Sequence, residues 1–305
     1  MENNFEEKFN KEGEEMKLEI KKETINSSMG EIETIEIIPE REKDSVPVLF
    51  APGWSVTVES SEDSLIKLAK KGRRVISLSH PRIGGDKEAQ KDISSEEMRK
   101  AISILTVINE KGLDKVDIFG YSEGAINSSV LASNLAPEKI GNMVLHNPAG
   151  MIGKDNPIKI SGRFLNNMTE VIKDELRHGR EIKDKVLIES FKYIVKNPLR
   201  SIKEINEIAK SDIKSNFKDL NEKGINIAIV HNVDDIVFDK TVQEGLTSKG
   251  SDDGYPVQGY YSISSESKAG HFDFLKDSEK VAIVIDHALG GLRNLEKIDK
   301  EKEEK

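Results

Sequence analysis

The sequence predicts an α/β fold with a mostly parallel central sheet flanked by helices and a helical cap inserted into it. Two observations indicate this architecture. Short apolar segments rich in β-branched residues, typical of strands buried on both faces, alternate with longer segments of helical periodicity. The alternation stops between Met151 and Lys223, where apolar residues recur only at helical spacing. Strand, helix and strand in succession form right-handed βαβ units, which build a parallel sheet with helices on both faces.

The chain begins with a different pattern. Residues 1–15 are acidic and polar, which predicts an N-terminal extension outside the core. Lys17–Lys22 and Glu31–Ile38 then alternate apolar and polar residues, as half-buried antiparallel strands do. The segments predicted as buried parallel strands are Val46–Ala51, Arg74–Ser79, Val116–Phe119, Met143–Leu145 and Ile225–Val230. Helices are predicted between them at Ser60–Lys71, Glu96–Glu110 and Ser122–Leu135.

The helical stretch divides the core in two. We expect the core to comprise residues 16–150 and 224–293, and the helical cap to comprise residues 151–223. Such an insertion commonly forms a lid over a pocket, and the alternative is a packed helical subdomain without a gating role. Residues 294–305 are mostly charged and predict a frayed C-terminal tail. After the cap we expect a helix at Lys240–Ser248, a strand at Tyr255–Ser264 and a closing helix at Leu275–Leu289.

The composition excludes several classes of function. The net charge of −9 argues against general nucleic-acid binding, which needs a basic surface. The chain has no cysteine, which excludes disulfides, zinc–thiolate sites, iron–sulfur clusters and cysteine nucleophiles. Its acidic start is unlike a secretory signal, and its apolar runs are too short to cross a bilayer. We therefore expect a cytoplasmic protein without a membrane partner, whose oligomeric state the sequence does not predict.

The sequence Gly120-Tyr121-Ser122-Glu123-Gly124 fits the G-x-S-x-G pattern of a nucleophile elbow. It stands between a predicted strand and a predicted helix, where a tight turn strains the backbone at Ser122. Glycines on both sides remove the Cβ atoms that would clash. The serine hydroxyl would then lie above the sheet at a helix N-terminus, where developing negative charge is favoured. The alternative is an ordinary strand–turn–helix connection with a serine cap.

A serine nucleophile needs a base and an acid that orients it. His271 is the candidate base because it lies in a loop beyond the last predicted strand. The candidate acids, Asp234 and Asp235, both follow the strand Ile225–Val230, and the alternation of side chains does not separate them. His178 and His287 lie within helical segments, whereas His80, His146 and His231 each follow an apolar strand and are candidates for the pocket wall.

Backbone N–H donors are needed to stabilise the anionic oxygen of a tetrahedral intermediate. The first candidate is the N–H of Glu123, directly after the serine. The second is the N–H of Trp54 in Pro52-Gly53-Trp54, which follows an early strand and where Gly53 permits a close approach of the backbone. The alternative for that tripeptide is a plain turn at the end of a strand.

Taken together, these motifs resemble the α/β-hydrolase fold superfamily over roughly residues 17–293. The order serine, acid, histidine is the one this fold uses. The superfamily's pattern puts the acid two residues before an aliphatic pair, which implies Asp234, ahead of Ile236 and Val237, with Asp235 as the second choice. Two features depart from the pattern: Pro52 replaces a common histidine, and the segment after Ser79 lacks a common aspartate. A serine nucleophile disfavours the dehalogenase and epoxide-hydrolase branches.

The resemblance implies an esterase-like serine hydrolase that acts on a small-molecule carboxylic ester or related acyl compound and needs no metal or organic cofactor. Ser122, Asp234 and His271 would be catalytic, with Trp54 and Glu123 as oxyanion donors and His80, Tyr121 and His146 in the pocket wall. Peptidase, C–C bond hydrolase, thioesterase and acyltransferase chemistry are alternatives within the fold, and a non-catalytic binding protein is the alternative outside it. A metal-dependent hydrolase is disfavoured because no H-E-x-x-H spacing occurs.

Overall fold

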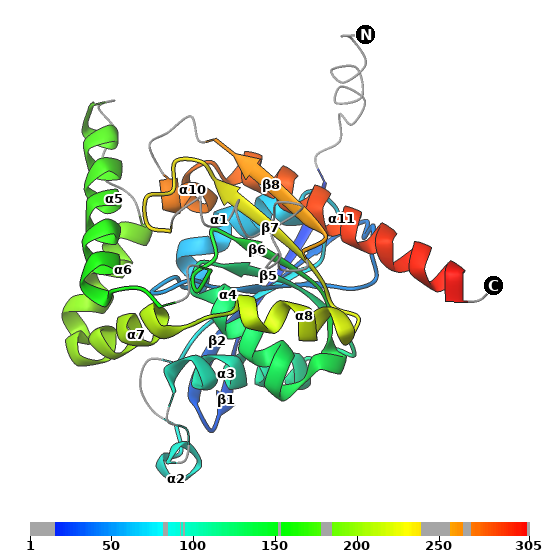
Figure 1. Ribbon diagram of the computed structural model, residues 1–305, viewed down its shortest axis with the longest axis horizontal. Helices are drawn as coiled ribbons and strands as arrows, with labels where there is room; N and C mark the ends of the chain where they lie inside the picture. The colour runs from blue at the N-terminus through cyan, green and yellow to red at the C-terminus, as the bar shows by residue number, and fades with distance from the viewer. Residues whose placement is uncertain are drawn as a thin grey trace.

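The computed structural model describes residues 16–81, 85–91, 93, 95–151, 154–177, 185–238, 257–264 and 270–303. Within these residues, eight strands form one sheet in the order β1-β2-β4-β3-β5-β6-β7-β8, with helices on both faces (Figure 1). The fold class predicted from the sequence is therefore confirmed. The predictions for residues 1–15, for His178 and for the helix Lys240–Ser248 lie outside the described residues.

The sheet is antiparallel at one edge and parallel elsewhere. β1 (Leu18–Ser27) and β2 (Gly30–Pro39) form a hairpin, and β2 also pairs antiparallel with β4 (Val75–Ser79). β1 is the edge strand, and its exposed lysine and glutamate side chains discourage pairing with other chains. The remaining strands are parallel: β3 (Val48–Ala51), β5 (Val116–Tyr121), β6 (Ile140–His146), β7 (Asn226–Asn232) and β8 (Gly259–Ile263).

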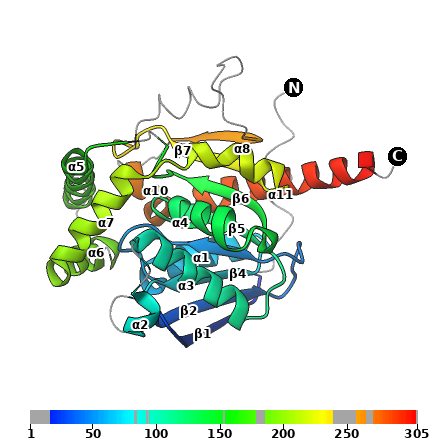
Figure 2. The same cartoon turned by 60° about the horizontal axis from the view of Figure 1, so that its bottom comes forward.

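Alternate side chains of the central strands supply the two halves of the core. Val48 and Phe50 of β3 pack with α1 (Val58–Ala69) and α11 (Ser278–Glu303) on one face. Leu49, the residue between them, packs on the opposite face with the helices drawn in front of the sheet in Figure 2. Those helices are α3 (Glu96–Glu110), α4 (Gly124–Val130), continued by a π-helical turn at Leu131–Leu135, and α8 (Lys214–Glu222).

Three helices of the 151–223 stretch stand together at one end of the sheet, on the left of Figure 1. They are α5 (Pro157–Arg177), α6 (Lys185–Lys196) and α7 (Pro198–Lys210), and we call them the inserted helices. The fourth helix, α8, instead packs against β7, with Phe217 and Leu220 fully buried. The segment that projects from the core is thus shorter than the stretch that shows helical periodicity. Short elements complete the fold: α2 (Lys87–Gln90), α10 (Asp273–Lys276) and 3-10 turns at Pro137–Lys139 and Gly270–Phe272.

The C-terminal helix differs from its prediction. The sequence indicated a closing helix that ends at Leu289 and a frayed tail from residue 294, but α11 continues to Glu303 and extends beyond the body of the molecule (Figure 1). The tail prediction is wrong because charge opposes burial and does not oppose helix formation. Lysine and glutamate are good helix formers, and an existing helix is extended without a new nucleation step.

Candidate active site

Ser122 lies in the sharp turn between β5 and α4, with a backbone φ of 55°. Side-chain-bearing residues rarely adopt this left-handed region, so the turn stores strain. The flanking glycines make it possible. A Cβ atom on Gly124 would lie 2.0 Å from the carbonyl oxygen of Ala51, and one on Gly120 would lie 3.2 Å from the backbone of Ala125. The local geometry is that of the nucleophile elbow indicated by the sequence.

Ser122, His271 and Asp235 form a continuous chain of contacts. His271 Nε2 lies 2.8 Å from Ser122 Oγ, and His271 Nδ1 lies 2.8 Å from Asp235 Oδ2. All three residues are buried. The serine and the histidine come from the ends of separate elements, 149 positions apart in the chain, and the sheet brings them to one edge. Chemically, this arrangement can transfer the serine proton to an imidazole whose positive charge a carboxylate stabilises.

The acid differs from the predicted one. Asp234 is exposed, whereas the buried Asp235 contacts His271. The reason is the turn that follows β7: the N–H of Asp235 donates to the Asn232 carbonyl, so the chain reverses and the alternation of the strand no longer applies. The second carboxylate oxygen of Asp235 accepts the N–H groups of Val237 (2.7 Å) and Phe238 (3.3 Å). The carboxylate that contacts His271 is therefore that of Asp235, and the prediction of Asp234 is wrong.

The carboxylate of Asp235 is ionised in spite of its burial. Burial by itself would raise the pKa of Asp235, but the nearby charge and hydrogen bond of His271 lower it below the usual value. His231 Nε2 lies 3.9 Å from the same carboxylate oxygen, and burial lowers the pKa of His231. Asp235 thus carries the negative charge that an imidazolium at His271 requires.

Tyr121 and His146, predicted for the pocket wall, lie in the core beneath His271. They are register partners on β5 and β6, so they share one face of the sheet, and their rings stack with centroids 5.8 Å apart. Tyr121 donates its hydroxyl to the carbonyl of His271 at 2.6 Å. His146 Nε2 lies 2.7 Å from Oδ1 of Asp273, which anchors the turn that carries His271. The pocket-wall prediction is wrong for both because their side chains point toward α10 and not toward the inserted helices.

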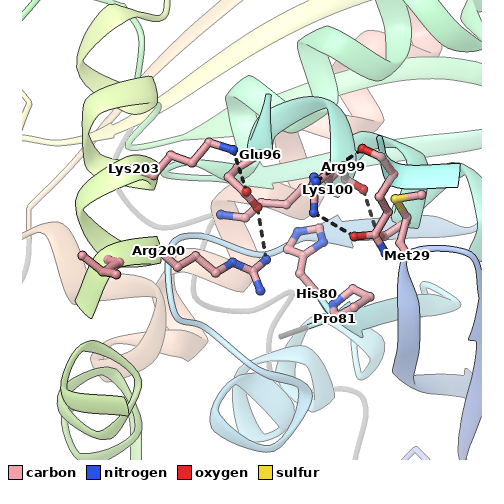
Figure 3. Close-up of a pocket in the computed structure, with 11 residues that line it drawn as sticks. Met29, His80, Pro81, Glu96, Arg99, Lys100, Arg200 and Lys203 are labelled. Carbon is pink, nitrogen blue, oxygen red and sulfur yellow. Dashed lines mark hydrogen bonds and ion pairs between the residues drawn. The ribbon is translucent and has the colours of Figure 1, made fainter. Parts of the chain in front are cut away.

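His80 lines a different cavity, of about 400 Å³, between α3 and α7 (Figure 3). Burial, reinforced by the positive charges of Lys100 and Arg200, holds the pKa of His80 well below its usual value. The cations around it are matched by carboxylates, for example Lys203 with Glu96 at 2.9 Å. His80 also lines a small space beside Gly53 and Glu123, but it does not line the cavity that contains Ser122.

The Pro52-Gly53-Trp54 loop runs directly against the nucleophile turn. A Cβ atom on Gly53 would lie 3.0 Å from Ser122 Cβ and 3.1 Å from the Tyr121 carbonyl oxygen, so a side chain at this position would push the two segments apart by a few tenths of an ångström. Trp54 lines the same cavity as Ser122 and His271. The structure therefore brings together the two residues, Trp54 and Glu123, whose N–H groups are the candidate oxyanion donors.

The cavity at Ser122 is small and mostly apolar. Its volume is about 30 Å³, far below the roughly 300–1,000 Å³ of usual ligand pockets. The inserted helices form much of its wall, with α5 and α7 closing it from above. The lining residues are Trp54, Ser122, Ile160, Ser161, Phe164, Ile205, Ile208, Val237, Phe238 and His271. Entry of a substrate therefore requires movement of the surrounding side chains or helices.

Sequence reasoning missed Glu204 of α7 and Lys100 of α3, which form a buried ion pair beside this site. The available signal was their position. Each charge falls four residues before an isoleucine of the buried helix face, Ile208 and Ile104 respectively. A charged residue on an apolar face is expected to be paired, because an unpaired buried charge is costly.

The described residues contain no cluster of three or more histidine, cysteine, aspartate or glutamate side chains that could hold a metal ion. None of the helices in the described part of the chain is long and apolar enough to span a bilayer.

Comparisons with known proteins agree with this architecture. A family model described as the alpha/beta hydrolase fold matches residues 46–277, more than half of the chain. An esterase from Exiguobacterium antarcticum is similar with a TM-score of 0.61 and 16% identity, over 87% of this chain and 98% of that one. Bromoperoxidase from Bacillus anthracis is similar with a TM-score of 0.59 and 16% identity, over 88% of this chain and 100% of that one. An N-acyl homoserine lactone degrading enzyme is similar with a TM-score of 0.62 and 15% identity, over 86% of this chain and 98% of that one. The sequence has no significant match among curated proteins.

Proposed function

Because the chain belongs to the alpha/beta hydrolase fold family, we propose that it is a serine hydrolase that cleaves a carboxylic ester or related acyl compound through an acyl-enzyme on Ser122. The observation that carries this proposal is the pair of 2.8 Å contacts of His271, one to the Ser122 hydroxyl and one to the Asp235 carboxylate. The similarity to an esterase structure supports the same class of reaction.

In the first half of the reaction, Ser122 Oγ attacks the substrate carbonyl carbon while His271 Nε2 accepts the hydroxyl proton. Asp235 holds the other ring nitrogen and stabilises the imidazolium that forms. The N–H groups of Trp54 and Glu123 donate to the anionic oxygen of the tetrahedral intermediate, where one such donor contributes about 2.7–4 kcal/mol. The intermediate collapses when the leaving alcohol takes the proton from His271, which leaves the acyl group on Ser122.

In the second half, water replaces the alcohol. His271 Nε2 accepts a proton from the water as it attacks the acyl carbonyl, and a second tetrahedral intermediate forms at the same donors. The proton returns to Ser122 Oγ as the carboxylic acid leaves. The reaction therefore consumes one water and restores the free serine without a cofactor.

The lining of the cavity favours a short apolar acyl group. Ile160 and Phe164 of α5 and Ile205 of α7 surround the space above Ser122, and none of them offers a hydrogen bond. Polar acyl groups would lose hydration there without compensation. Among p-nitrophenyl esters, we expect the acetate and butyrate to be cleaved with higher kcat/KM than long-chain esters, because the space in this closed arrangement is small.

Labelling with a serine-directed fluorophosphonate tests the assignment of the nucleophile. The wild-type protein should be labelled and should hydrolyse p-nitrophenyl acetate, and Ser122→Ala should lose both properties. Ser161→Ala is the matched control, because Ser161 lines the same cavity from α5 without contacting His271. Labelling of Ser122→Ala at the wild-type rate would remove Ser122 from the nucleophile role.

A further inference from the structure

The buried carboxylate of Glu204 joins the inserted helices to the loop beside the nucleophile. Its Oε2 accepts the indole N–H of Trp54 at 2.8 Å and the hydroxyl of Tyr193, on α6, at 2.7 Å. Its Oε1 lies 3.1 Å from the ammonium of Lys100. One carboxylate on α7 therefore contacts α6, α3 and the loop that carries Trp54, and its side chain is only 1% exposed.

The same network reaches the second candidate oxyanion donor. Lys100 Nζ lies 2.6 Å from Oε1 of Glu123, the residue directly after Ser122. Glu204 and Lys100 thus connect, through side chains, the two residues whose main-chain N–H groups would hold the oxyanion. A network in this position constrains where both residues sit.

Lys100 and Glu204 stay charged although both are buried. Burial would lower the pKa of Lys100, but the carboxylates of Glu123 and Glu204 raise it above its usual value. Burial would raise the pKa of Glu204, but the charge of Lys100 and the hydrogen bonds from Tyr193 and Trp54 lower it. Glu204 is consequently an anion, and the indole N–H of Trp54 makes a charge-assisted hydrogen bond to it.

Trp54 is also packed between the inserted helices. Its ring meets Phe164 of α5 at a centroid distance of 5.2 Å and Tyr193 of α6 at 6.2 Å, both edge-to-face. The adjacent Ser55 donates its hydroxyl to Ser190 of α6 at 2.6 Å. The loop at Trp54 is therefore seated against all three inserted helices, and displacement of α7 would break the bond between Glu204 and Trp54.

We propose that Glu204 is a positioning residue: by holding the Trp54 indole, it sets the main-chain N–H of Trp54 at the oxyanion position only when the inserted helices are closed over Ser122. Opening of these helices for substrate entry would release Trp54, and closing would complete the oxyanion site. This inference rests on the proposed hydrolase function and adds a coupling between helix closure and catalysis.

A double-mutant cycle tests the coupling. Trp54→Phe retains the main-chain N–H and an aromatic ring but removes the indole donor. We expect Glu204→Ala to lower kcat on p-nitrophenyl acetate roughly tenfold to a hundredfold and to leave KM without an increase. Complete loss of an oxyanion donor would lower kcat by ~10²–10³, and the effect is smaller here because the main-chain N–H is displaced but still present. In the Trp54→Phe background, Glu204→Ala should change kcat by less than about twofold, because the hydrogen bond between residues 54 and 204 is already absent. The proposal would be overturned if Glu204→Ala lowered kcat by the same factor in both backgrounds.

Fluorescence provides a readout that does not require activity. Trp54 is the sole tryptophan of the chain, so the intrinsic emission reports on it alone. In Glu204→Ala, the emission should shift to longer wavelength and acrylamide should quench it more, because the indole is released toward water. Lys210→Gln, an exposed change on the same helix, should leave both unchanged. Glu204→Met replaces the alanine variant if the latter does not fold, since methionine fills a similar volume and removes the acceptor of the indole N–H.

The two readouts separate the possible failures. Emission and quenching that remain at wild-type values in both Glu204 variants would overturn the positioning role, whatever the activity. A shifted emission in a protein that has no hydrolase activity would refute the proposed function while leaving the structural coupling of Glu204 and Trp54 intact. A shifted emission with unchanged kcat would overturn the link between Trp54 and the oxyanion.

Discussion

Replacement of Asp235 by asparagine should abolish most of the activity through the tautomer of His271. One oxygen of Asp235 accepts the N–H groups of Val237 and Phe238, and the other faces His271 Nδ1. In Asp235→Asn, the amide oxygen must stay with the two N–H donors, so the NH₂ group points at His271. The imidazole must then accept there and carry its proton on Nε2, where it can no longer take the proton of Ser122.

The expected loss is large. A change of this kind in a serine triad lowers kcat about 10⁴-fold, which corresponds to about 5.4 kcal/mol at about 1.36 kcal/mol for each factor of ten. The assay is the steady-state hydrolysis of p-nitrophenyl acetate, with circular dichroism to establish that the variant is folded. Asp234→Asn is the matched control, one position away but exposed, and should retain kcat within about twofold. Loss of activity in Asp234→Asn with full activity in Asp235→Asn would refute the reasoning.

Three further predictions concern stability. Gly124→Ala should lower the free energy of unfolding, measured with urea, by at least about 3 kcal/mol, because its methyl group would lie 2.0 Å from a backbone oxygen of β3. Gly162→Ala in α5 is the control: it has open space around it and should raise the free energy of unfolding by about 0.5–1 kcal/mol. Lys100→Met should lower the free energy of unfolding by about 3–5 kcal/mol, because it removes the cation that Glu123 contacts at 2.6 Å and leaves buried Glu204 with Arg200 alone, at 3.4 Å; a loss below 1 kcal/mol would contradict this. The folded-state pKa of Asp235 is lowered, so its contribution to stability is present above the unfolded value of about 3.9 and lost as pH falls through the folded value. The stability gap between wild type and Asp235→Asn should accordingly narrow between pH 6 and pH 3, and a gap that widens would contradict the ionised state of Asp235.

The fold and the nucleophile turn were predictable because they depend on local signals. The strands β3 to β7 are short, apolar and β-branched, and such segments are buried in a parallel sheet whatever their neighbours are. The glycines around Ser122 likewise report a steric requirement that is local: Gly124 packs against β3 because the turn leaves no room for a side chain. His271 was identifiable because it follows the last strand and precedes the closing helix.

The acid and the pocket wall were less predictable because they depend on turns and on three-dimensional neighbours. Which of Asp234 and Asp235 faces His271 is decided by the turn that begins at Asn232, and a pattern of alternation does not report such a turn. Tyr121 and His146 are the last residues of β5 and β6, and their shared register places both rings in the core. Glu204 and Trp54 are 150 positions apart, so the local sequence around Glu204 indicates that this carboxylate is paired but does not identify its partner.

The small volume above Ser122 has a kinetic consequence. If substrate enters only while the helices above the serine are displaced, the apparent dissociation constant equals the intrinsic one divided by the fraction of molecules in the open form. A protein that is open one time in a hundred would bind its substrate about a hundredfold more weakly than its contacts alone allow. The tight seal that keeps bulk water from the serine thereby also sets the substrate concentration at which the protein begins to work.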